Sequence, residues 1–182
     1  MQLNKLQVFL SFLLLSLLSV SVQAKDGYTI KAHFTDVLKE TKIYLATCML
    51  KLNRTEELFE LAEELDRGRG RNQDAQVFFI VANAAYEQEN YAKSAQYFKT
   101  YLDKRGELSR GGYFRYAQSY YKTKKYDAAI PVYQKAISRE RDTLTQIASY
   151  YLGFCFLEKG EKENARAAFE IAAKTPEPSN RQ

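Results

Sequence analysis

Few residues in this chain could do chemistry, and their types and spacing do not assemble a reactive site. The 182 residues include one histidine, His33, and two cysteines, Cys48 and Cys155. Zinc is held by several His, Cys or carboxylate ligands, and one histidine without a cysteine pair near it cannot supply them. No serine or cysteine has an obvious base beside it in the sequence. We therefore expect no metal, no cofactor and no catalysis.

The charged residues predict solvated surfaces rather than a catalytic pair or a nucleic-acid site. Glu56-Glu57 and Glu63-Glu64 are adjacent acids of the kind found on the exposed face of a helix. Residues 66–72 (DRGRGRN) resemble an Arg-Gly nucleic-acid segment only superficially, and a short segment between two expected helices is typical of a linker. The formal charge of +5 comes from interspersed bases and acids. The chain therefore lacks the clustered basic surface that nucleic-acid binding requires.

Residues 1–24 have the features of a secretory signal peptide. Lys5 supplies a positive start, residues 8–22 are apolar apart from serines, and Val22-Gln23-Ala24 offers small residues where a signal peptidase cleaves. The apolar run is shorter than the ~20 residues that span a bilayer as a helix. We expect residues 1–24 to be removed from an exported protein, periplasmic or secreted. An uncleaved membrane anchor is the alternative.

The elements that must carry any function recur along the chain. Residues 78–102, 113–137 and 149–173 superpose, and each indicates an apolar helix, a short polar turn and a second amphipathic helix. A weaker copy lies upstream, with residues 41–52 as its first helix and residues 55–65 as its second. Thr55 followed by two acids is a good helix start, because a hydroxyl caps the first turn and acids favour the positive end of the helix dipole.

The residue types at fixed positions of these repeats resemble the tetratricopeptide-repeat (TPR) family. The family's Leu-Gly pair is matched by Val81-Ala82, Tyr116-Ala117 and Leu152-Gly153. The small position of the second helix holds Ser94, Ala129 and Ala165, and the aromatic position after it holds Phe98, Tyr133 and Phe169. Small residues let two helices approach closely, and large ones fill the groove beside them. Tyr101 at a normally small position and Ser149 at a normally large one depart from the pattern.

The resemblance implies an all-α fold, a TPR-type right-handed superhelix of antiparallel helix pairs. We expect a TPR domain over residues 39–174 and a tail over residues 175–182. The expected repeats cover about 39–72, 75–108, 110–143 and 146–179. Pro131, inside a second helix, removes one backbone hydrogen bond, so we expect a slight bend and no break. Gly160 suits the end of the last repeat's first helix.

Residues 25–38 form an N-terminal extension for which two interpretations stay open. Residues 28–34 (YTIKAHF) alternate apolar and polar residues strictly, which is typical of a strand. Residues 42–48 could pair with them in a short hairpin, and residues 26–31 resemble the start of a β-rich domain in exported Bacteroidetes proteins. The helical interpretation of residues 42–48 is favoured, because a lone hairpin is marginal without further strands.

The two cysteines occupy the same position in the first and last repeats. Stacked repeats contact only their neighbours, so two intervening units separate Cys48 from Cys155 by far more than the ~7 Å between Cα atoms that a disulfide tolerates. We expect both to be small buried core residues, as free cysteines usually are. Pairing between molecules is the alternative.

The resemblance implies a binding surface on the concave face, lined by exposed positions of the first helices. Tyr and Arg are enriched at binding hot spots, because they combine contact area with a polar group. The expected partner-binding residues are Phe79, Asn83, Tyr86 and Glu87; Phe114, Arg115, Gln118, Tyr121 and Lys122; and Tyr150, Tyr151, Phe154 and Glu158. We expect a non-catalytic scaffold of the bacterial periplasm or cell envelope that binds a protein or peptide. The alternative is an accessory subunit of an envelope assembly or nutrient-uptake complex, with an N-terminal hairpin module.

The C-terminal edge is a second candidate surface. The last expected helix, residues 164–174, is followed by Thr175-Pro176 and by no further amphipathic pattern that would cover it. Its face with Phe169 and Ile171 should be partly bare. We expect either a homo-oligomer through this edge or a partner that completes the stack.

Overall fold

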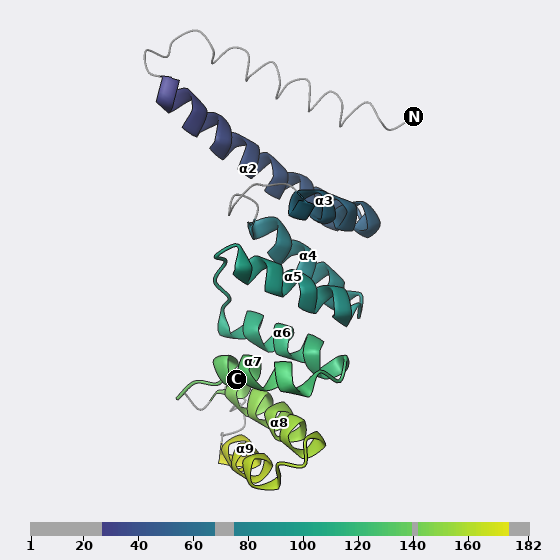
Figure 1. The fold of residues 1–182 in the computed structure, drawn as a ribbon, viewed down its shortest axis with the longest axis vertical. Helices are drawn as coiled ribbons and strands as arrows, with labels where there is room; N and C mark the ends of the chain where they lie inside the picture. Colours follow the sequence, from purple (N-terminus) through teal and green to yellow (C-terminus); the bar gives the residue numbers. More distant parts are fainter. Residues whose placement is uncertain (1–26, 68–74, 140–141, 175–182) are drawn as a thin grey trace, which may run out of the picture. The chain divides into compact units, whose positions relative to one another are not determined.

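The computed structural model describes residues 27–67, 75–139 and 142–174, and these residues contain helices and no strand (Figure 1). The helices are α2 (Gly27–Lys51), α3 (Thr55–Arg67), α4 (Ala75–Glu87), α5 (Tyr91–Asp103), α6 (Arg110–Lys122), α7 (Tyr126–Ala136), α8 (Thr143–Glu158) and α9 (Lys162–Lys174). The chain divides into two compact units, residues 1–41 and 42–182. All the buried side chains of the described part belong to the second unit. The all-α prediction is confirmed.

The N-terminal strand interpretation is wrong, because residues 27–51 form the single helix α2. Period-two alternation favours a strand only where a second strand can satisfy the backbone hydrogen bonds, whereas a helix satisfies them within itself. The hairpin across residues 28–48 therefore does not form. The signal peptide over residues 1–24, most of the linker over residues 66–72 and the tail over residues 175–182 lie outside the described residues.

Within the second unit, helix pairs stack in chain order. Each pair packs internally, α4 with α5, α6 with α7 and α8 with α9. Neighbouring pairs meet through α3 with α4, α5 with α6, and α7 with α8, and the first helices of neighbouring pairs also touch, α4 with α6 and α6 with α8. Such nearest-neighbour packing is the hallmark of a repeat array. It is also why each first helix has one face against the preceding pair and another toward the following one.

The turns inside the four pairs share one backbone conformation. Asn53, Glu89, Lys124 and Gly160 all adopt positive φ, between 55° and 77°. In each turn the N–H of the next residue donates to a carbonyl in the last turn of the preceding helix, over 2.8 to 2.9 Å. A left-handed residue followed by such a bond is a common way to end a helix. The first pair, whose sequence pattern is weakest, thus has the same turn as the others, and only the last turn uses glycine.

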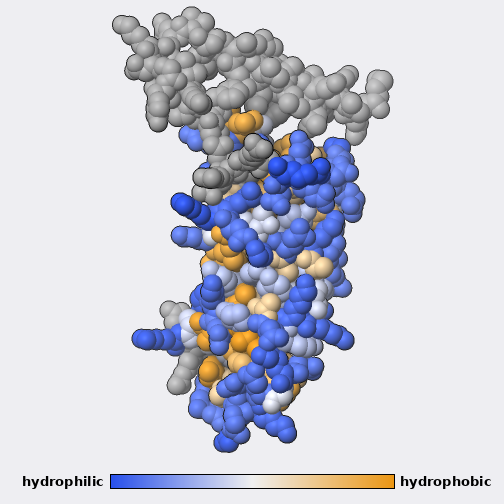
Figure 2. All heavy atoms as spheres, in the orientation of Figure 1, coloured by the Kyte–Doolittle hydropathy of each residue, from blue (hydrophilic) through white to orange (hydrophobic). Residues whose placement is uncertain are grey.

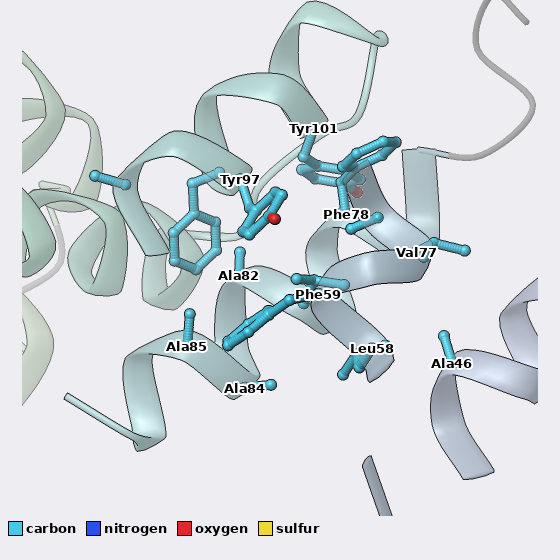
Figure 3. Packing of buried hydrophobic residues seen from close by; sticks show 14 of the residues in the cluster. Ala46, Leu58, Phe59, Val77, Phe78, Ala82, Ala84, Ala85, Tyr97 and Tyr101 are labelled. Atoms are coloured by element: carbon cyan, nitrogen blue, oxygen red, sulfur yellow. The ribbon is translucent and has the colours of Figure 1, made fainter. Parts of the chain in front are cut away.

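The first core cluster joins α2 to α6 through alternating small and large side chains. Phe78, Phe98 and Val81 are fully buried, and Ala82 and Ala85 lie beside them. Figure 3 shows these alanines of α4 facing the rings of neighbouring helices. Small residues at the crossing points allow the helices to approach closely, and the rings fill the remaining volume. Ala82 and Ser94, named from the sequence as small, and Phe98, named as large, are all fully buried.

Gly153 has a specific packing reason to be glycine. A Cβ placed there would lie 2.6 Å from the ring of Phe169 on α9. Atoms at that distance overlap, so the ring occupies the space of the missing side chain. The Leu-Gly position of the last repeat and the aromatic position of its second helix are thus in direct contact.

The departure at Tyr101 is accommodated by a glycine in the following loop. Tyr101 is buried, and its hydroxyl donates to the Glu107 carbonyl over 3.1 Å. A Cβ on Gly106 would overlap the Tyr101 ring. The ring therefore packs against the loop that follows α5, and it does not occupy the point at which the two helices cross. At the other departure, Ser149 is fully buried.

Pro131 lies within α7, which continues to Ala136, so the helix is not broken, as expected.

The two cysteines differ in burial. Cys155 is buried as expected, but Cys48 is exposed, and both are free. The burial prediction is wrong for Cys48 because its helix face packs on no preceding helix pair among the described residues, whereas α8 packs on α7.

Candidate protein-binding surface

The candidate surface is formed by α4, α6 and α8, the first helices of their pairs, and is called the helix A face below. Most of its expected residues are partly or fully exposed: Phe79, Asn83, Tyr86, Glu87, Phe114, Arg115, Tyr121, Lys122, Tyr150, Tyr151, Phe154 and Glu158. Gln118 is the exception, with only 4% of its surface exposed. It lies in the middle of α6, which α4 and α8 contact from either side. The expectation that Gln118 offers a contact surface is therefore wrong.

Arg115 is the polar centre of this face. Its guanidinium donates to the Asn83 side-chain oxygen over 2.7 Å and pairs with the Glu87 carboxylate at 3.3 Å. It also lies over the Tyr86 ring, 5.6 Å from the ring centre. The side chain keeps 43% of its surface exposed. Arg115 thus joins α6 to α4 and still presents donors to the surroundings, since a guanidinium has five N–H groups.

Two tyrosine pairs repeat across neighbouring helix pairs. Tyr86 lies edge-to-face with Tyr91 at 5.7 Å between ring centres, and Tyr121 lies edge-to-face with Tyr126 at 5.9 Å. The Lys122 ammonium lies 5.9 Å from the centre of the Tyr91 ring. Tyr91 and Tyr126 were not among the residues expected from the sequence. Their signal was a tyrosine five residues after the helix A tyrosine, present in both repeats.

Burial raises the pKa of Tyr86 and of Tyr121 above the usual tyrosine value, with neighbouring tyrosines adding to the effect. Both phenols therefore stay protonated at neutral pH and can donate a hydrogen bond. Tyr86, Glu87, Tyr91, Arg115 and Lys122 together form what is called the polar–aromatic patch below. It combines ring faces, two cations and one carboxylate from α4, α5 and α6.

The remaining rings of the helix A face lie mainly between helices. Phe79 packs against Phe98 and Tyr101. Phe114 and Tyr151 pack against Tyr133, with the Tyr151 and Tyr133 rings stacked at 6.2 Å and an interplanar angle of 7°. These residues contribute more to holding the pairs together than to a free surface.

On α8 the aromatic residues are more open. Tyr150 is 48% exposed and lies edge-to-face with Phe154 at 4.8 Å and with Phe169 at 6.0 Å. Figure 2 shows apolar residues in several patches over the region of α4 to α8, between hydrophilic residues. The helix A face therefore changes from polar and aromatic on α4 and α6 to apolar on α8.

A polar tie fixes the start of α8 to the third pair. Arg110 donates to both Asp142 carboxylate oxygens, over 2.6 and 3.0 Å, and to the Ala136 carbonyl over 2.9 Å. Asp142 caps α8 by accepting from the Thr145 N–H over 2.7 Å. The Arg110 guanidinium and this N–H hold the pKa of the Asp142 carboxyl well below its usual range. The tie orients α8, and with it the apolar end of the helix A face.

Comparison with known proteins decides the family. A family model described as tetratricopeptide repeat matches residues 81–143 and 114–180, which together make more than half of the 182-residue chain. The chain belongs to the tetratricopeptide-repeat family. TPR arrays use extended surfaces of stacked repeats to bind other proteins, and they are generally non-catalytic.

Similarity to solved structures agrees with the TPR assignment. Sixteen chains of solved structures match this chain. One of them is MamA of AMB-1, with 14% sequence identity and a TM-score of 0.59, covering 75% of this chain and 72% of that one. At this identity the likeness shows the TPR fold alone. None of the curated proteins matches the chain.

In the described part of this TPR protein, the His, Cys, Asp and Glu residues form no group of three or more that could hold a metal ion. Burial raises the pKa of the Cys155 thiol to about 12, so Cys155 is a neutral thiol at physiological pH. No described helix is both long and apolar enough to cross a membrane.

Proposed function

We propose that this TPR protein is exported to the bacterial periplasm or cell envelope, where it is a non-catalytic scaffold that binds a protein segment through its helix A face. The observation that carries the proposal is the polar–aromatic patch. Its Arg115 and Lys122 cations lie over tyrosine rings and remain partly or fully exposed. Exposed cations over aromatic rings, next to hydrogen-bond donors, are typical of binding hot spots.

The chemistry of the patch favours a segment with carboxylate and aromatic side chains. Arg115 already pairs with Glu87, which is exposed and held at 3.3 Å. An incoming carboxylate can replace Glu87 on the guanidinium or bind the Lys122 ammonium, because both groups only donate hydrogen bonds. The Tyr86 and Tyr121 rings offer edges and faces to an aromatic side chain. The segment would lie across α4 and α6 and continue toward Tyr150 on α8.

Export is proposed from the sequence of residues 1–24 alone. The positive start, the apolar run and the small residues before Lys25 support a cleaved signal peptide. Fractionation of cells that produce the tagged chain, with and without residues 1–24, tests this step. If the chain that is expressed with residues 1–24 stays in the cytoplasm, export is contradicted, whereas the binding proposal is unaffected.

The accessory-subunit alternative carries less support. It rested on an N-terminal hairpin module, and residues 27–51 are helical instead. A role within an envelope assembly or uptake complex remains compatible with a TPR scaffold, but no residue described above favours that role over others.

The binding proposal is tested by capturing envelope proteins on the immobilised chain. Lys122→Ala and Tyr121→Ala remove a cation and a ring from the helix A face, and each should weaken binding of the captured partner at least tenfold. Lys99→Ala is the matched control, because Lys99 is an exposed lysine on α5 that pairs with Asp103 of the same helix. Equal binding by all four proteins would reject the helix A face as the binding surface.

A further inference from the structure

Two adjoining apolar grooves run along the outer edge of the last helix pair. Phe169 and Ala173 line both grooves, together with Leu157 and Ala165 in one and Ile147 and Tyr150 in the other. Leu157 and Ile147 are 45% and 39% exposed. Large apolar residues gathered on one exposed face usually mark a contact surface.

The preceding helix pair shows what occupies the same place. There α8 packs on α6 and α7, and Tyr151 contacts aromatic rings of both helices. The Tyr151 ring lies 6.2 Å from Phe114, 5.3 Å from Tyr121 and 6.2 Å from Tyr133, measured between ring centres. Cys155, one turn further along α8, is fully buried. A Tyr and a Cys four residues apart are thus the part of α8 that enters the preceding pair.

The three residues that receive Tyr151 have counterparts at the outer edge. Shifted by one repeat, Phe114, Tyr121 and Tyr133 become the apolar residues Tyr150, Leu157 and Phe169. These three residues line the two grooves. The grooves therefore continue an interface that is already formed between α8 and the third pair, and their shape suits the first helix of another TPR repeat.

The chain carries such a helix at its other end. Residues 44–48 of α2 read Tyr-Leu-Ala-Thr-Cys, and residues 151–155 of α8 read Tyr-Leu-Gly-Phe-Cys. Tyr44 and Cys48 thus repeat the Tyr151 and Cys155 pair. On α2, however, Tyr44 is 67% exposed and Cys48 is exposed as well. The same contact residues that are covered on α8 are uncovered on α2.

We propose that two copies of this chain associate head to tail, with the Tyr44–Cys48 face of α2 in one copy docked in the α8/α9 grooves of the next. Each copy contributes a different surface, so the contact is heterologous and can extend to further copies. Docking would repeat the packing of α8 on the third pair at the boundary between molecules. The inference concerns the two ends of the stack and does not rest on partner binding at the polar–aromatic patch.

The experiment uses two charge substitutions, one on each surface, in protein purified from expression of the full chain. Tyr44→Glu blocks the α2 surface and leaves the grooves intact, and Leu157→Glu blocks the grooves and leaves α2 intact. Both positions are substantially exposed, so we expect both variants to fold, with unchanged helical circular dichroism. Gln96→Glu is the control, because Gln96 is exposed on α5, away from both surfaces.

Sedimentation velocity over a concentration series gives the result. The unmodified chain and Gln96→Glu should form species that grow with concentration, whereas each edge variant alone should lose association and remain a monomer. An equimolar mixture of Tyr44→Glu and Leu157→Glu should form dimers and nothing larger, because only one productive contact per pair of molecules survives.

Three results would overturn the proposal. The unmodified chain could remain a monomer at every concentration. If Leu157→Glu then also blocked capture of a different protein, the grooves would be assigned to a helix of that protein instead. The edge variants could associate as strongly as the unmodified chain. The mixture could fail to form dimers although the unmodified chain associates, which would exclude a contact between unlike surfaces.

Discussion

The junction of α5 with α6 and the junction of α7 with α8 have the same architecture and differ in the chemistry of one contact position. In the first, the hydroxyls of Ser94 and Ser119 lie 2.9 Å apart in a fully buried contact, and Arg115 joins the two first helices through Asn83. In the second, Tyr151 stacks on Tyr133. The Tyr133 hydroxyl is buried and has no hydrogen-bond partner among the described residues.

Arg115 and Tyr151 occupy the same position of successive repeats, and so do Ser119 and Cys155. The alternation of small and large residues at the helix crossings is shared, so it sets the geometry of stacking. The residue in the contact position then decides whether hydrogen bonds or ring contacts form at that position. Stacking geometry and junction chemistry are thus separately adjustable in this array.

The largest expected effect tests whether both junctions depend equally on their central ring. Phe98 and Tyr133 hold the same repeat position and are both fully buried. Phe98→Ala and Tyr133→Ala should each lower the free energy of unfolding by about 3–5 kcal/mol, because each leaves a large cavity. Urea unfolding followed by circular dichroism measures both losses. A loss at one position less than half that at the other would show that the junctions are not equivalent.

The next effect compares how tightly the helix pairs themselves close. Gly153→Ala places a Cβ 2.6 Å from the Phe169 ring and should cost about 1–3 kcal/mol, since overpacking outweighs the gain in helix propensity. Gly111→Ala is the control, because the nearest atom to its Cβ is 3.9 Å away. It should raise stability by up to about 1 kcal/mol. Thermal unfolding that is lowered equally by both substitutions would contradict the contact with Phe169.

The polar tie at α8 should make the second junction sensitive to acid. The folded-state pKa of Asp142 lies below its unfolded value, so its stabilisation is present above about pH 4 and is lost as pH falls through the folded pKa. At neutral pH, Asp142→Ala should cost about 1–2 kcal/mol through the lost helix cap. The difference between the two proteins should shrink in denaturant titrations at acid pH. A difference that stays constant with pH would assign no role to the ionised carboxylate.

The smallest effect separates the two chemistries most directly, because it removes one hydroxyl from each junction. Ser119→Ala breaks a bonded pair and should cost about 1 kcal/mol. Tyr133→Phe removes a buried hydroxyl that has no partner among the described residues, so stability should stay the same or rise by up to about 1 kcal/mol. Equilibrium unfolding of both variants at neutral pH gives the sign of each change. A clear loss in Tyr133→Phe would mean that the Tyr133 hydroxyl takes part in a stabilising hydrogen bond.

The fold could be predicted from the sequence because its signals are periodic. The pairing of Gly153 with Phe169 and the small residues at helix crossings recur at fixed positions, and a recurring position reports a recurring contact. The strand predicted for residues 28–34 was wrong because the alternation of apolar and polar residues is local, and the helix α2 extends through it. The burial predicted for Cys48 was wrong because this repeat position is buried only where a preceding helix pair covers it. The sequence pattern does not show whether such a pair is present.

The candidate surface could be predicted only in part. Repeat register identified the helix A residues, but it does not show which of them neighbouring helices cover, as at Gln118. Repeat register did not identify Tyr91 and Tyr126, because they belong to the second helices. They reach the helix A face by their ring contacts with Tyr86 and Tyr121, just beyond the turn. The division of the face into a polar end and an apolar end depends on packing between repeats, which single positions do not encode.

The contact between Tyr101 and Gly106 makes these two positions interdependent. The ring of Tyr101 occupies the volume in which any side chain at position 106 would have to begin. In related chains, an aromatic residue at position 101 should therefore be accompanied by glycine at position 106. A small residue at position 101 leaves position 106 free to vary. A side chain at position 106 would overlap the ring for as long as Tyr101 is present, so a change at position 106 is expected to follow the loss of the aromatic residue at position 101.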